Sequence, residues 1–493
     1  TIAIQSKMGY NEFCISFNHI FFTFILFYSR DTLKWQSRFA YGEELYLQKG
    51  IRLFASVLSA AISGMEVCPV QVEADVSSGL PCFTMVGFPS TQVKEAQDRV
   101  RTALKNNGIS LPPKKVTVNL APADLRKEGA GFDLPVAAAV LAASGFIEPQ
   151  LLRNVMVVGE LSLNGEVRSV SGVLPRVIRA RELGCRYCII PFENLAEGAL
   201  VKDMKVVGVQ NIKEVLKLVS DPDAFGKENQ FSEVNSEENQ VEESLVDFGE
   251  ICGQESARRA AEIAVSGFHN ILFIGPPGTG KTMLAKRIPT IMPSLTFEES
   301  LELTKIYSIA GLLSPKRPLI KARPFRSPHH TSSSAALAGG GRIPGPGEVT
   351  LAHRGVLFLD EMPEFARGSL EVLRQPLEDK QIQLSRASGT YVFPAGFILV
   401  AAMNPCPCGY YPDMNKCRCT PGEVSHYLHK LSQPLLERID LCADVPPVNF
   451  SQISGEKSGE SSALIRKRVE KARRIQQKRY QNEKICFNGE LSG

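Results

Sequence analysis

The strongest chemical signal in this sequence is a glycine-rich loop of the kind that binds phosphate. A short apolar segment at residues 270–274 runs into GPPGTGKT, Gly275 to Thr282, and a helical pattern follows. Glycines let backbone N–H groups close around phosphate oxygens at a helix N-terminus, where the helix dipole favours negative charge. Lys281 is expected to reach the β- and γ-phosphates, and the Thr282 hydroxyl to bind Mg²⁺. The predicted cofactors are therefore ATP and Mg²⁺. The loop residues expected to bind the nucleotide are Gly275, Pro276, Pro277, Gly278, Thr279, Gly280, Lys281 and Thr282.

Two further segments end in polar side chains that suit hydrolysis. GVLFLDE, Gly355 to Glu361, is an apolar strand pattern that ends in two carboxylates. After a phosphate-binding loop, this pattern predicts that Asp360 holds Mg²⁺ and that Glu361 polarises the attacking water. A third apolar strand pattern at residues 397–402 comes just before Asn404. That amide is expected to contact the γ-phosphate or the water, and an amide that caps a turn is the alternative.

The elements that must position these groups fall into several segments. Length alone predicts about three domains. Residues 51–220 carry alternating strand patterns and helical stretches, typical of an α/β or α+β domain. Residues 248–445 hold the strands named above, which predicts a parallel α/β sheet. Between them, residues 221–247 contain nine acidic residues and one lysine, and we expect an acidic linker there. Residues 446–493 contain a basic helix pattern, which we interpret as the start of a helical C-terminal lid.

Composition limits the class of protein without naming a function. The chain has 493 residues, 44% of them hydrophobic, and a net charge of +4, which is too small to indicate nucleic-acid binding by itself. The twelve cysteines are mostly scattered, and this favours a reducing, cytoplasmic setting. An aromatic-rich segment at residues 13–28 is shorter than the ~20 apolar residues of a membrane helix. We therefore expect residues 1–50 to be a non-native or mis-called extension, not an anchor, and expect no membrane partner.

The order of these motifs resembles that of an AAA+ ATPase. The residues within and around the motifs indicate a more specific family. HNILFIGPPGTGKTMLAKR, RPFRSPHHT, PGPGEVTLAHRGVLFLDEMPEF and AAMNPCPCGYY resemble the magnesium-chelatase-like YifB/ComM family over residues 52–480. The resemblance implies that Gly253 and Gln254 contact the adenine. It also implies that Arg438, in LLERIDL, is an arginine finger that reaches a neighbouring subunit in a homo-oligomeric ring, typically a hexamer. Local pairing of Arg438 with Glu437 or Asp440 is the alternative.

The first domain carries a second resemblance. EGAGFDLPVAAAVLAA (Glu128 to Ala143) and LNGEVRSVSGVL (Leu163 to Leu174) are similar to the Lon-type protease domain, a ribosomal-S5-like α+β fold. That protease uses a serine nucleophile activated by a lysine. Gly129 and Leu174 stand at these two positions here, so the resemblance implies a catalytically dead module. Arg126 and Lys127 are candidate phosphate contacts or part of a solvated charged loop.

Cysteines and basic segments give weaker signals. Cys406, Cys408, Cys417 and Cys419 have the spacing C-x-C-x8-C-x-C. Four thiols suit a tetrahedral Zn²⁺ site, but paired ligands are usually separated by two to four residues, so free thiols stay open as the alternative. Lys380 and Arg386 flank a hairpin pattern and are candidates to contact a DNA backbone. The terminal helix pattern has eight Lys or Arg and one Glu between Arg466 and Arg479, which is either a solvated face or a DNA contact.

These features favour an ATP-hydrolysing ring motor. By resemblance, its partner is DNA and its task is helicase or branch-migration work during recombination of incoming DNA. The ATPase subunit of a metal-chelatase-type complex and a protein-remodelling module are the alternatives. The sequence leaves open the DNA structure and polarity that such a motor would prefer, and whether a chain without a complete lid is active.

Overall fold

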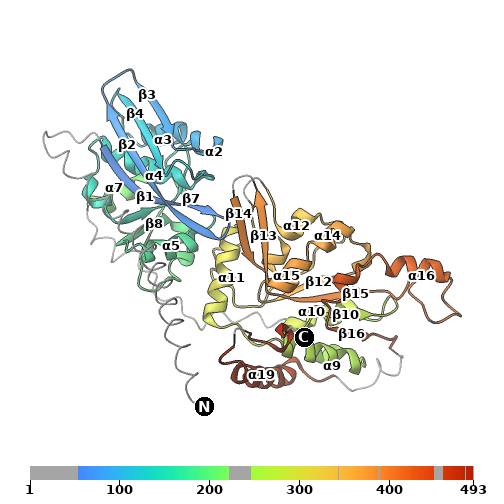
Figure 1. The fold of residues 1–493 in the computed structure, drawn as a ribbon. Helices are drawn as coiled ribbons and strands as arrows, with labels where there is room; N and C mark the ends of the chain where they lie inside the picture. The colour runs from blue at the N-terminus through green and yellow to red at the C-terminus, as the bar shows by residue number, and fades with distance from the viewer. Residues whose placement is uncertain are drawn as a thin grey trace, which may run out of the picture.

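The computed structural model describes residues 54–220, 246–341, 344–386, 389–448, 459–483 and 485–491. These residues form two α/β bodies, each built on its own sheet, with the first body at the upper left of Figure 1. The expected extension at residues 1–50 lies outside the described residues. The expected acidic linker also lies outside them, apart from its last two residues.

The first body is built on a mixed sheet of seven strands. In their spatial order these are β3 (Cys82–Val86), β4 (Lys115–Ala121), β2 (Glu66–Ser77), β1 (Phe54–Ser63), β5 (Val155–Val157), β8 (Tyr187–Pro191) and β9 (Lys205–Val209). The alternation predicted for β2 is confirmed, because Val70, Val72, Ala74 and Val76 are buried and the residues between them are partly exposed. A short ladder joins β6 (Glu160–Leu161) to β7 (Val167–Arg168).

Helices cover this mixed sheet. They are α2 (Thr91–Lys94), α3 (Ala96–Asn106), α4 (Asp133–Ala143), α5 (Val173–Glu182), α6 (Leu195–Gly198) and α7 (Ile212–Ser220). All eleven residues of α4 are buried, because this helix packs against β1, β2 and α3. The one charged side chain of α4, Asp133, is paired with Arg99 of α3 at 2.7 Å. A fully apolar helix with one paired carboxylate marks the centre of this body.

The second body is built on a five-stranded sheet whose strands are all parallel, as the sequence predicted. The spatial order is β11 (Phe325–Arg326), β12 (Val356–Leu359), β15 (Ile398–Met403), β10 (Ile271–Ile274) and β16 (Leu441–Asp444). Side chains of β10 alternate between two cores, with Ile271 and Phe273 on one face and Leu272 on the other. The sheet is therefore buried on both faces, which is why its strands read as continuous apolar runs.

Helices lie on both faces of this sheet, and one hairpin projects from it (Figure 1). The helices are α9 (Glu255–Gly267), α10 (Lys281–Ile291), α11 (Phe297–Ile309), α12 (Ser334–Ala338), α13 (Glu348–Leu351), α14 (Arg367–Glu371), α15 (Arg374–Asp379), α16 (Pro421–Leu428), α17 (Gln433–Leu436) and α19 (Ser462–Arg479). The predicted hairpin consists of β13 (Gln381–Arg386) and β14 (Gly389–Pro394).

Helix α19 packs on α9 and α10 through a face that includes Ile465, Val469 and Gln476. Ile475 is 53% exposed, whereas Gln476 is buried and donates to the Ser266 carbonyl. The reason is the helical period, since residue 476 lies eleven positions after Ile465 and returns to the same face, whereas residue 475 is turned about 80° away.

The two bodies contact one another through α11 and α5. Ser308 of α11 donates its hydroxyl to the buried Glu197 carboxylate of the first body. The Ser308 carbonyl accepts a hydrogen bond from Gly172 N at 2.8 Å. At a second point, the turn between β1 and β2 packs beside the hairpin, where Gly64 faces the ring of Tyr391. The hairpin is thus partly covered by the first body.

None of the described helices is both long enough and apolar enough to cross a membrane.

Candidate nucleotide-binding site

The glycine-rich loop lies at the carboxyl end of β10, where the sheet hands over to α10. Gly278 and Gly280 have φ values of 78° and 90°, a region that only glycine enters at little cost, and Gly280 is the residue before the first turn of α10. Gly275 has no room for a side chain, because a Cβ there would lie 2.2 Å from the Val445 carbonyl oxygen. The loop is thus held closely against the neighbouring strand end, with the helix N-terminus facing the space expected for phosphate.

The ammonium group of Lys281 is held inside this loop. It donates to the carbonyls of Gly275 and Pro276 at 2.7 and 2.8 Å, and to Asn404 Oδ1 at 3.1 Å. Burial lowers the pKa of Lys281 from its ordinary value, and the carboxylates of Asp360 and Glu361 oppose that shift. The structure therefore brings together the predicted phosphate-binding lysine and the predicted amide at the end of β15.

The two residues expected to bind Mg²⁺ also lie side by side. Thr282 Oγ1 donates to Asp360 Oδ2 at 2.7 Å, although the residues are 78 positions apart in the chain. Neighbouring oxygen ligands of an octahedral Mg²⁺ are about 3 Å apart, given metal–oxygen bonds of 2.0–2.1 Å. A hydroxyl and a carboxylate at this separation fit the donor set and spacing that the ion requires.

Glu361 occupies a strained backbone position next to this pair. Its φ is 50°, in the left-handed region that is uncommon for a residue with a side chain. Its N–H donates to Asp360 Oδ1 at 3.1 Å, and its side chain is exposed. Asp360 contacts Thr282, whereas Glu361 is exposed, which suits one carboxylate for the metal and one for water.

The two residues implied to contact adenine lie beside the loop. Gly253 and Gln254 both have positive φ, and Gln254 comes just before α9. The Gln254 amide donates to the Thr279 carbonyl at 3.3 Å and to the Pro446 carbonyl at 2.6 Å. Gln254 thus ties the start of α9 to the glycine-rich loop.

Arg438 lies at the end of the sheet that is opposite to the glycine-rich loop. Its carbonyl accepts a hydrogen bond from the Asn270 side chain at 2.8 Å, which places it at the amino end of β10. Its guanidinium forms an ion pair with Glu378 and donates to the Pro434 carbonyl. Neither local partner expected from the sequence is used, because Asp440 instead accepts from Asn270 N at 2.7 Å, and Gln433 donates to Glu437 at 3.4 Å. Four residues of strand, at about 3.3 Å each, separate Arg438 from the loop of its own chain.

Comparison with known proteins identifies the family. The family described as "Magnesium chelatase, subunit ChlI" matches residues 247–453, and "Subunit ChlI of Mg-chelatase" matches residues 72–194. The competence protein ComM of Haemophilus influenzae is 44% identical over 429 residues, which cover 86% of this chain and 83% of that protein. YifB of Escherichia coli is 44% identical over 424 residues, covering 86% and 82%. The chain belongs to the ComM/YifB family.

A more distant likeness accompanies this membership. The DNA repair protein RadA of Listeria monocytogenes is 30% identical over 185 residues, which cover 35% of this ComM/YifB-family chain and 38% of that protein. The parallel sheet and the glycine-rich loop agree with the AAA+ magnesium-chelatase-like character of the family.

The two positions at which the resemblance to the Lon-type domain would place a serine and a lysine carry no catalytic groups in this ComM/YifB-family chain. Gly129 has φ 81° and no side chain, and Leu174 is fully buried. Lys127 does not lie in a solvated loop, and its ammonium faces backbone carbonyls instead of the surface, where a phosphate contact was expected. It is fully buried, and its ammonium donates to the Gly87 carbonyl at 2.9 Å and to the Pro122 carbonyl, while burial lowers its pKa to about 8. Arg126 pairs with Glu128 at 2.7 Å.

Several basic side chains proposed for DNA are engaged within the chain. Lys380 donates to the Leu377 carbonyl and lies over the Phe268 ring, so it is not a free group on the hairpin. Arg466 donates to the Thr290 carbonyl at 3.0 Å, and Arg473 stacks on Phe487 at 3.6 Å. Arg386, at the end of β13, is exposed. Arg468 is exposed but paired with Glu262 and Glu460, and the other exposed basic residues of α19 are Lys467, Lys471, Arg474, Lys478 and Arg479.

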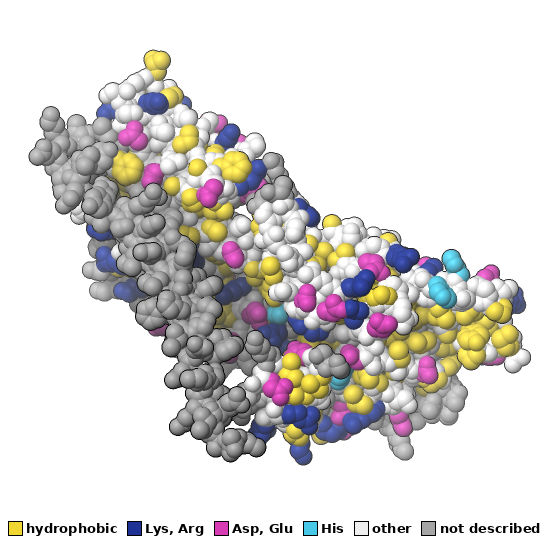
Figure 2. All heavy atoms as spheres, in the orientation of Figure 1, with side chains coloured by type: hydrophobic (Ala, Val, Ile, Leu, Met, Phe, Trp, Pro, Cys, Tyr) yellow, Lys and Arg dark blue, Asp and Glu magenta, His cyan; other side chains and the backbone are white. Residues whose placement is uncertain are grey.

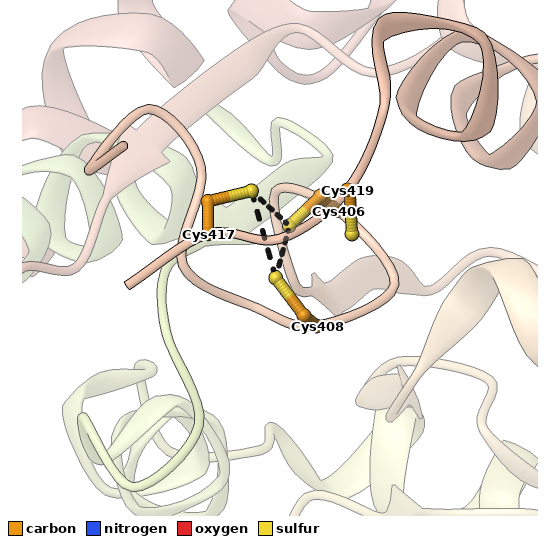
Figure 3. Close-up of side chains that lie close together, drawn as sticks. All are labelled: Cys406, Cys408, Cys417 and Cys419. Carbon is orange, nitrogen blue, oxygen red and sulfur yellow. Dashed lines mark hydrogen bonds between the residues drawn. The ribbon is translucent and has the colours of Figure 1, made fainter. Parts of the chain in front are cut away.

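The four clustered cysteines converge in space (Figure 3). The sulfurs of Cys406, Cys408, Cys417 and Cys419 all lie within 4.8 Å of one another. Backbone N–H groups of Tyr410 and Arg418 hydrogen-bond to the Cys408 sulfur, and these bonds lower the pKa of its thiol to about 6. None of the described cysteines forms a disulfide.

Two relationships around the site were not predicted from the sequence. The loop that carries the four cysteines, residues 404–420, packs on the glycine-rich loop. A Cβ on Gly409 would lie 2.6 Å from Pro277 Cδ. Glu378, the partner of Arg438, lies 60 residues earlier in the chain than that arginine. Neither contact leaves a signal in local spacing, since each depends on how β15, α15 and α17 are placed around the sheet.

Proposed function

We propose that this chain is an ATP-hydrolysing AAA+ motor that works as a homo-oligomeric ring, typically a hexamer, and moves on DNA. The observation that carries the proposal is the meeting of four predicted groups in two hydrogen-bonded pairs, Lys281 with Asn404 and Thr282 with Asp360. These pairs join one loop to the ends of two neighbouring strands. A turn that only closes the chain would not need this combination of an ammonium, an amide, a hydroxyl and a carboxylate.

Each group has a distinct role in this proposal. The backbone N–H groups of residues 275–280 and the Lys281 ammonium bind the phosphate oxygens, and Gln254 holds the start of α9 near the expected adenine. Thr282 and Asp360 hold Mg²⁺, which would neutralise charge on the phosphates. Glu361 accepts a proton from the attacking water, and Asn404 orients that water or the γ-phosphate.

The position of Arg438 supports a ring. It lies at the amino end of β10, roughly 13 Å of strand away from the loop at the other end. If Arg438 stabilises charge during hydrolysis, the nucleotide it acts on must therefore belong to a neighbouring subunit. In that arrangement Arg438 exchanges Glu378 for the phosphate of the neighbour.

The names of relatives favour DNA as the partner. ComM is named a competence protein, and RadA a DNA repair protein. We infer that this chain likewise serves recombination of incoming DNA, as a helicase or branch-migration motor in the cytoplasm. The exposed basic residues Arg386, Lys467 and Lys471 are proposed to contact the phosphate backbone of the DNA. The first body is proposed to have a Lon-like fold without protease chemistry and to serve in assembly or substrate contact.

The names of the family descriptions favour a second candidate, the ATPase subunit of a metal-chelatase-type complex. Such a protein would hydrolyse ATP with the same residues but would not move DNA strands. Separation of DNA strands therefore distinguishes the two functions better than ATP turnover does.

The test is strand displacement on a forked DNA, measured with ATP turnover in parallel. We expect the wild-type chain to separate the strands only with ATP and Mg²⁺, and DNA to raise its turnover. Glu361→Gln should still bind ATP but lose turnover by at least about 100-fold, because an amide cannot accept the proton. Glu364→Gln is the matched control, since Glu364 is an exposed carboxylate that pairs with Lys430 at the surface. ATP turnover with neither DNA stimulation nor strand displacement would favour the chelatase-type function.

A further inference from the structure

The loop between β15 and α16, residues 404–420, has almost no apolar core of its own. Its large side chains point outward, with Tyr410 40%, Tyr411 46% and Met414 73% exposed, and hydrophobic side chains gather on the surface around α16 in Figure 2. The buried side chains of this loop are Cys406 and Cys417. A loop with its aromatic residues outside and its thiols inside is not held together by hydrophobic burial.

The positions of three sulfurs have the spacing of a tetrahedral metal site, and the Cys419 sulfur lies within 4.8 Å of each of them. Sulfur–sulfur separations are 3.3 Å for Cys406 and Cys408, 3.6 Å for Cys408 and Cys417, and 3.8 Å for Cys406 and Cys417. Four thiolates around one Zn²⁺ at about 2.3 Å lie roughly 3.8 Å from one another. These distances are too long for disulfides, whose sulfurs are about 2.05 Å apart. The unusual C-x-C spacing is therefore compatible with tetrahedral ligation. The fold of the loop brings the pair Cys406 and Cys408 close to the pair Cys417 and Cys419.

Backbone groups also support thiolate ligands. Tyr411 N donates to Cys406 Sγ at 3.4 Å, and Gly409 N donates to the Cys406 carbonyl at 3.0 Å, which closes a tight turn between the first two cysteines. N–H groups directed at a sulfur stabilise its negative charge, as outer hydrogen bonds do around ligating residues. Thr420 and Glu423 form a capping box that begins α16 directly after Cys419.

The same loop touches the phosphate-binding machinery at two points. Asn404, whose Oδ1 accepts from Lys281, lies two residues before Cys406. Gly409, between the two cysteine pairs, is packed on Pro277 so closely that a Cβ would lie 2.6 Å from its Cδ. The position of this loop therefore sets the position of Asn404 and of one wall of the glycine-rich loop.

We propose that Cys406, Cys408, Cys417 and Cys419 bind one structural Zn²⁺ ion, which fixes the loop against the glycine-rich loop and holds Asn404 in place. Zinc is the ion of choice because four thiolates in a small tetrahedral site favour a soft, redox-inactive d¹⁰ cation. Binding of the ion does not depend on the proposed ATPase function, but its effect on turnover does.

The first experiment measures metal directly in the full-length chain, by mass spectrometry of the purified protein. We expect about one zinc per chain. Cys408→Ser/Cys417→Ser should lose it, whereas Cys82→Ser/Cys442→Ser, which removes two exposed cysteines elsewhere, should keep it. Wild-type protein without zinc, zinc retained by the first double variant, or iron with sulfide in place of zinc would each overturn the proposal.

Two further readouts guard against a variant that simply fails to fold. Cobalt substituted into the wild-type chain should give the absorption of tetrahedral thiolate ligation, and an octahedral spectrum would contradict the site. Alkylation followed by peptide mass analysis should show residues 406–419 protected until a chelator removes the zinc. Disulfides found within this peptide, or thiols that react equally before and after chelation, would also contradict it.

Removal of the zinc by a chelator, followed by removal of the chelator and return of Mg²⁺, should then lower ATP turnover and leave the first body folded, which circular dichroism and proteolysis can follow. If the wild-type chain holds zinc in these cysteines but hydrolyses no ATP, the metal site stands and the proposed motor function fails. If the wild-type chain hydrolyses ATP but holds no zinc, the metal site fails and the proposed ATPase activity stands.

Discussion

Lys281 Nζ donates to Asn404 Oδ1 over 3.1 Å, and this bond joins the glycine-rich loop to the strand next to it. The contact follows from the register of the sheet, because Ile274 at the end of β10 lies opposite Met403 at the end of β15. Residues just after two paired parallel strand ends meet at the same edge. The pairing of these strands thus places Lys281, which is proposed to bind phosphate, in contact with the Asn404 amide, which is proposed to orient the water or the γ-phosphate.

Asn404→Ala should lower turnover of ATP on the order of 100-fold, because one preorganised polar group near the developing charge is lost. Binding of ATP should change by less than about tenfold, since the loop N–H groups and Lys281 remain. Steady-state turnover and titration with a fluorescent ATP analogue measure the two effects separately. Asn415→Ala is the control, because Asn415 is an exposed amide in the same loop. Equal losses in both variants would contradict a specific role for Asn404.

Gly409→Ala should weaken ATP binding several-fold without removing the proposed zinc. The new Cβ would lie 2.6 Å from Pro277 Cδ, and Gly409 has φ 85°, a conformation that costs a non-glycine residue about 1 kcal/mol. The glycine-rich loop must shift to relieve the clash. Gly422→Ala, where a Cβ meets open space, should leave ATP binding unchanged. Zinc content and the dissociation constant for ATP, measured on the same samples, distinguish a shifted loop from a lost metal site.

Arg438→Ala should bind ATP but hydrolyse it poorly, because its guanidinium is proposed to act on the neighbouring subunit. Mixing Arg438→Ala with Lys281→Ala should restore part of the turnover, since some interfaces then combine an intact loop with an intact arginine. Turnover of the two variants is measured alone and at several mixing ratios. If every mixture stays as inactive as its components, Arg438 does not act between subunits. The Glu378 partner offers a further check, because Glu378→Gln frees Arg438 and should not reduce turnover.

The ion pairs of Glu302 should make stability depend on acid. Its carboxylate lies 3.2 Å from His353 Nε2 and 3.1 Å from Arg354 Nε, and the close contact with His353 is the main reason that its pKa is lowered to about 2. Because the folded pKa lies below the ordinary value of about 4.3, the stabilisation is complete above that pH and is lost as the pH falls toward 2. Glu302 is 39% exposed, so solvent screening limits the effect to about 1 kcal/mol.

Melting temperatures from about pH 3 to pH 7 measure this dependence. Glu302→Gln should melt earlier than the wild type near pH 6, and the difference should shrink as the pH is lowered. Glu298→Gln, an exposed position on the same helix, should follow the wild type throughout. A difference that grows in acid would contradict the sign of the pKa shift.

Ser308→Ala should loosen the contact between the two bodies. Its hydroxyl donates to the buried Glu197 carboxylate, which also accepts from Leu174 N at 2.8 Å. Leaving a buried carboxylate with one partner fewer costs about 1–3 kcal/mol. Calorimetry should therefore show the unfolding of the two bodies separating into two transitions. Ser59→Ala is the control, because Ser59 is also buried but its hydroxyl has no hydrogen-bond partner among the described residues. A single unchanged transition in Ser308→Ala would show that the interface does not depend on this bond.

The sequence by itself predicted the elements that bear chemistry. Apolar runs before Gly275, Asp360 and Asn404 correctly indicated buried parallel strands, because such strands are apolar on both faces and end where their polar residues begin. Alternation along β2 predicted a strand of the first body. The phosphate-binding loop was recognisable because its chemistry depends on residue types at fixed local spacing.

Only the tertiary structure decided which distant groups meet. It paired Arg438 with Glu378, buried Lys127 among backbone carbonyls, engaged Lys380 and Arg473 with aromatic rings, and brought four thiols within 4.8 Å of one another. Local patterns could not show these contacts, because the partners are far apart in the chain. They meet only after the strands and helices have packed. Periodicity in a sequence fixes which face of an element is apolar, whereas the packing of the elements fixes what each polar side chain can reach.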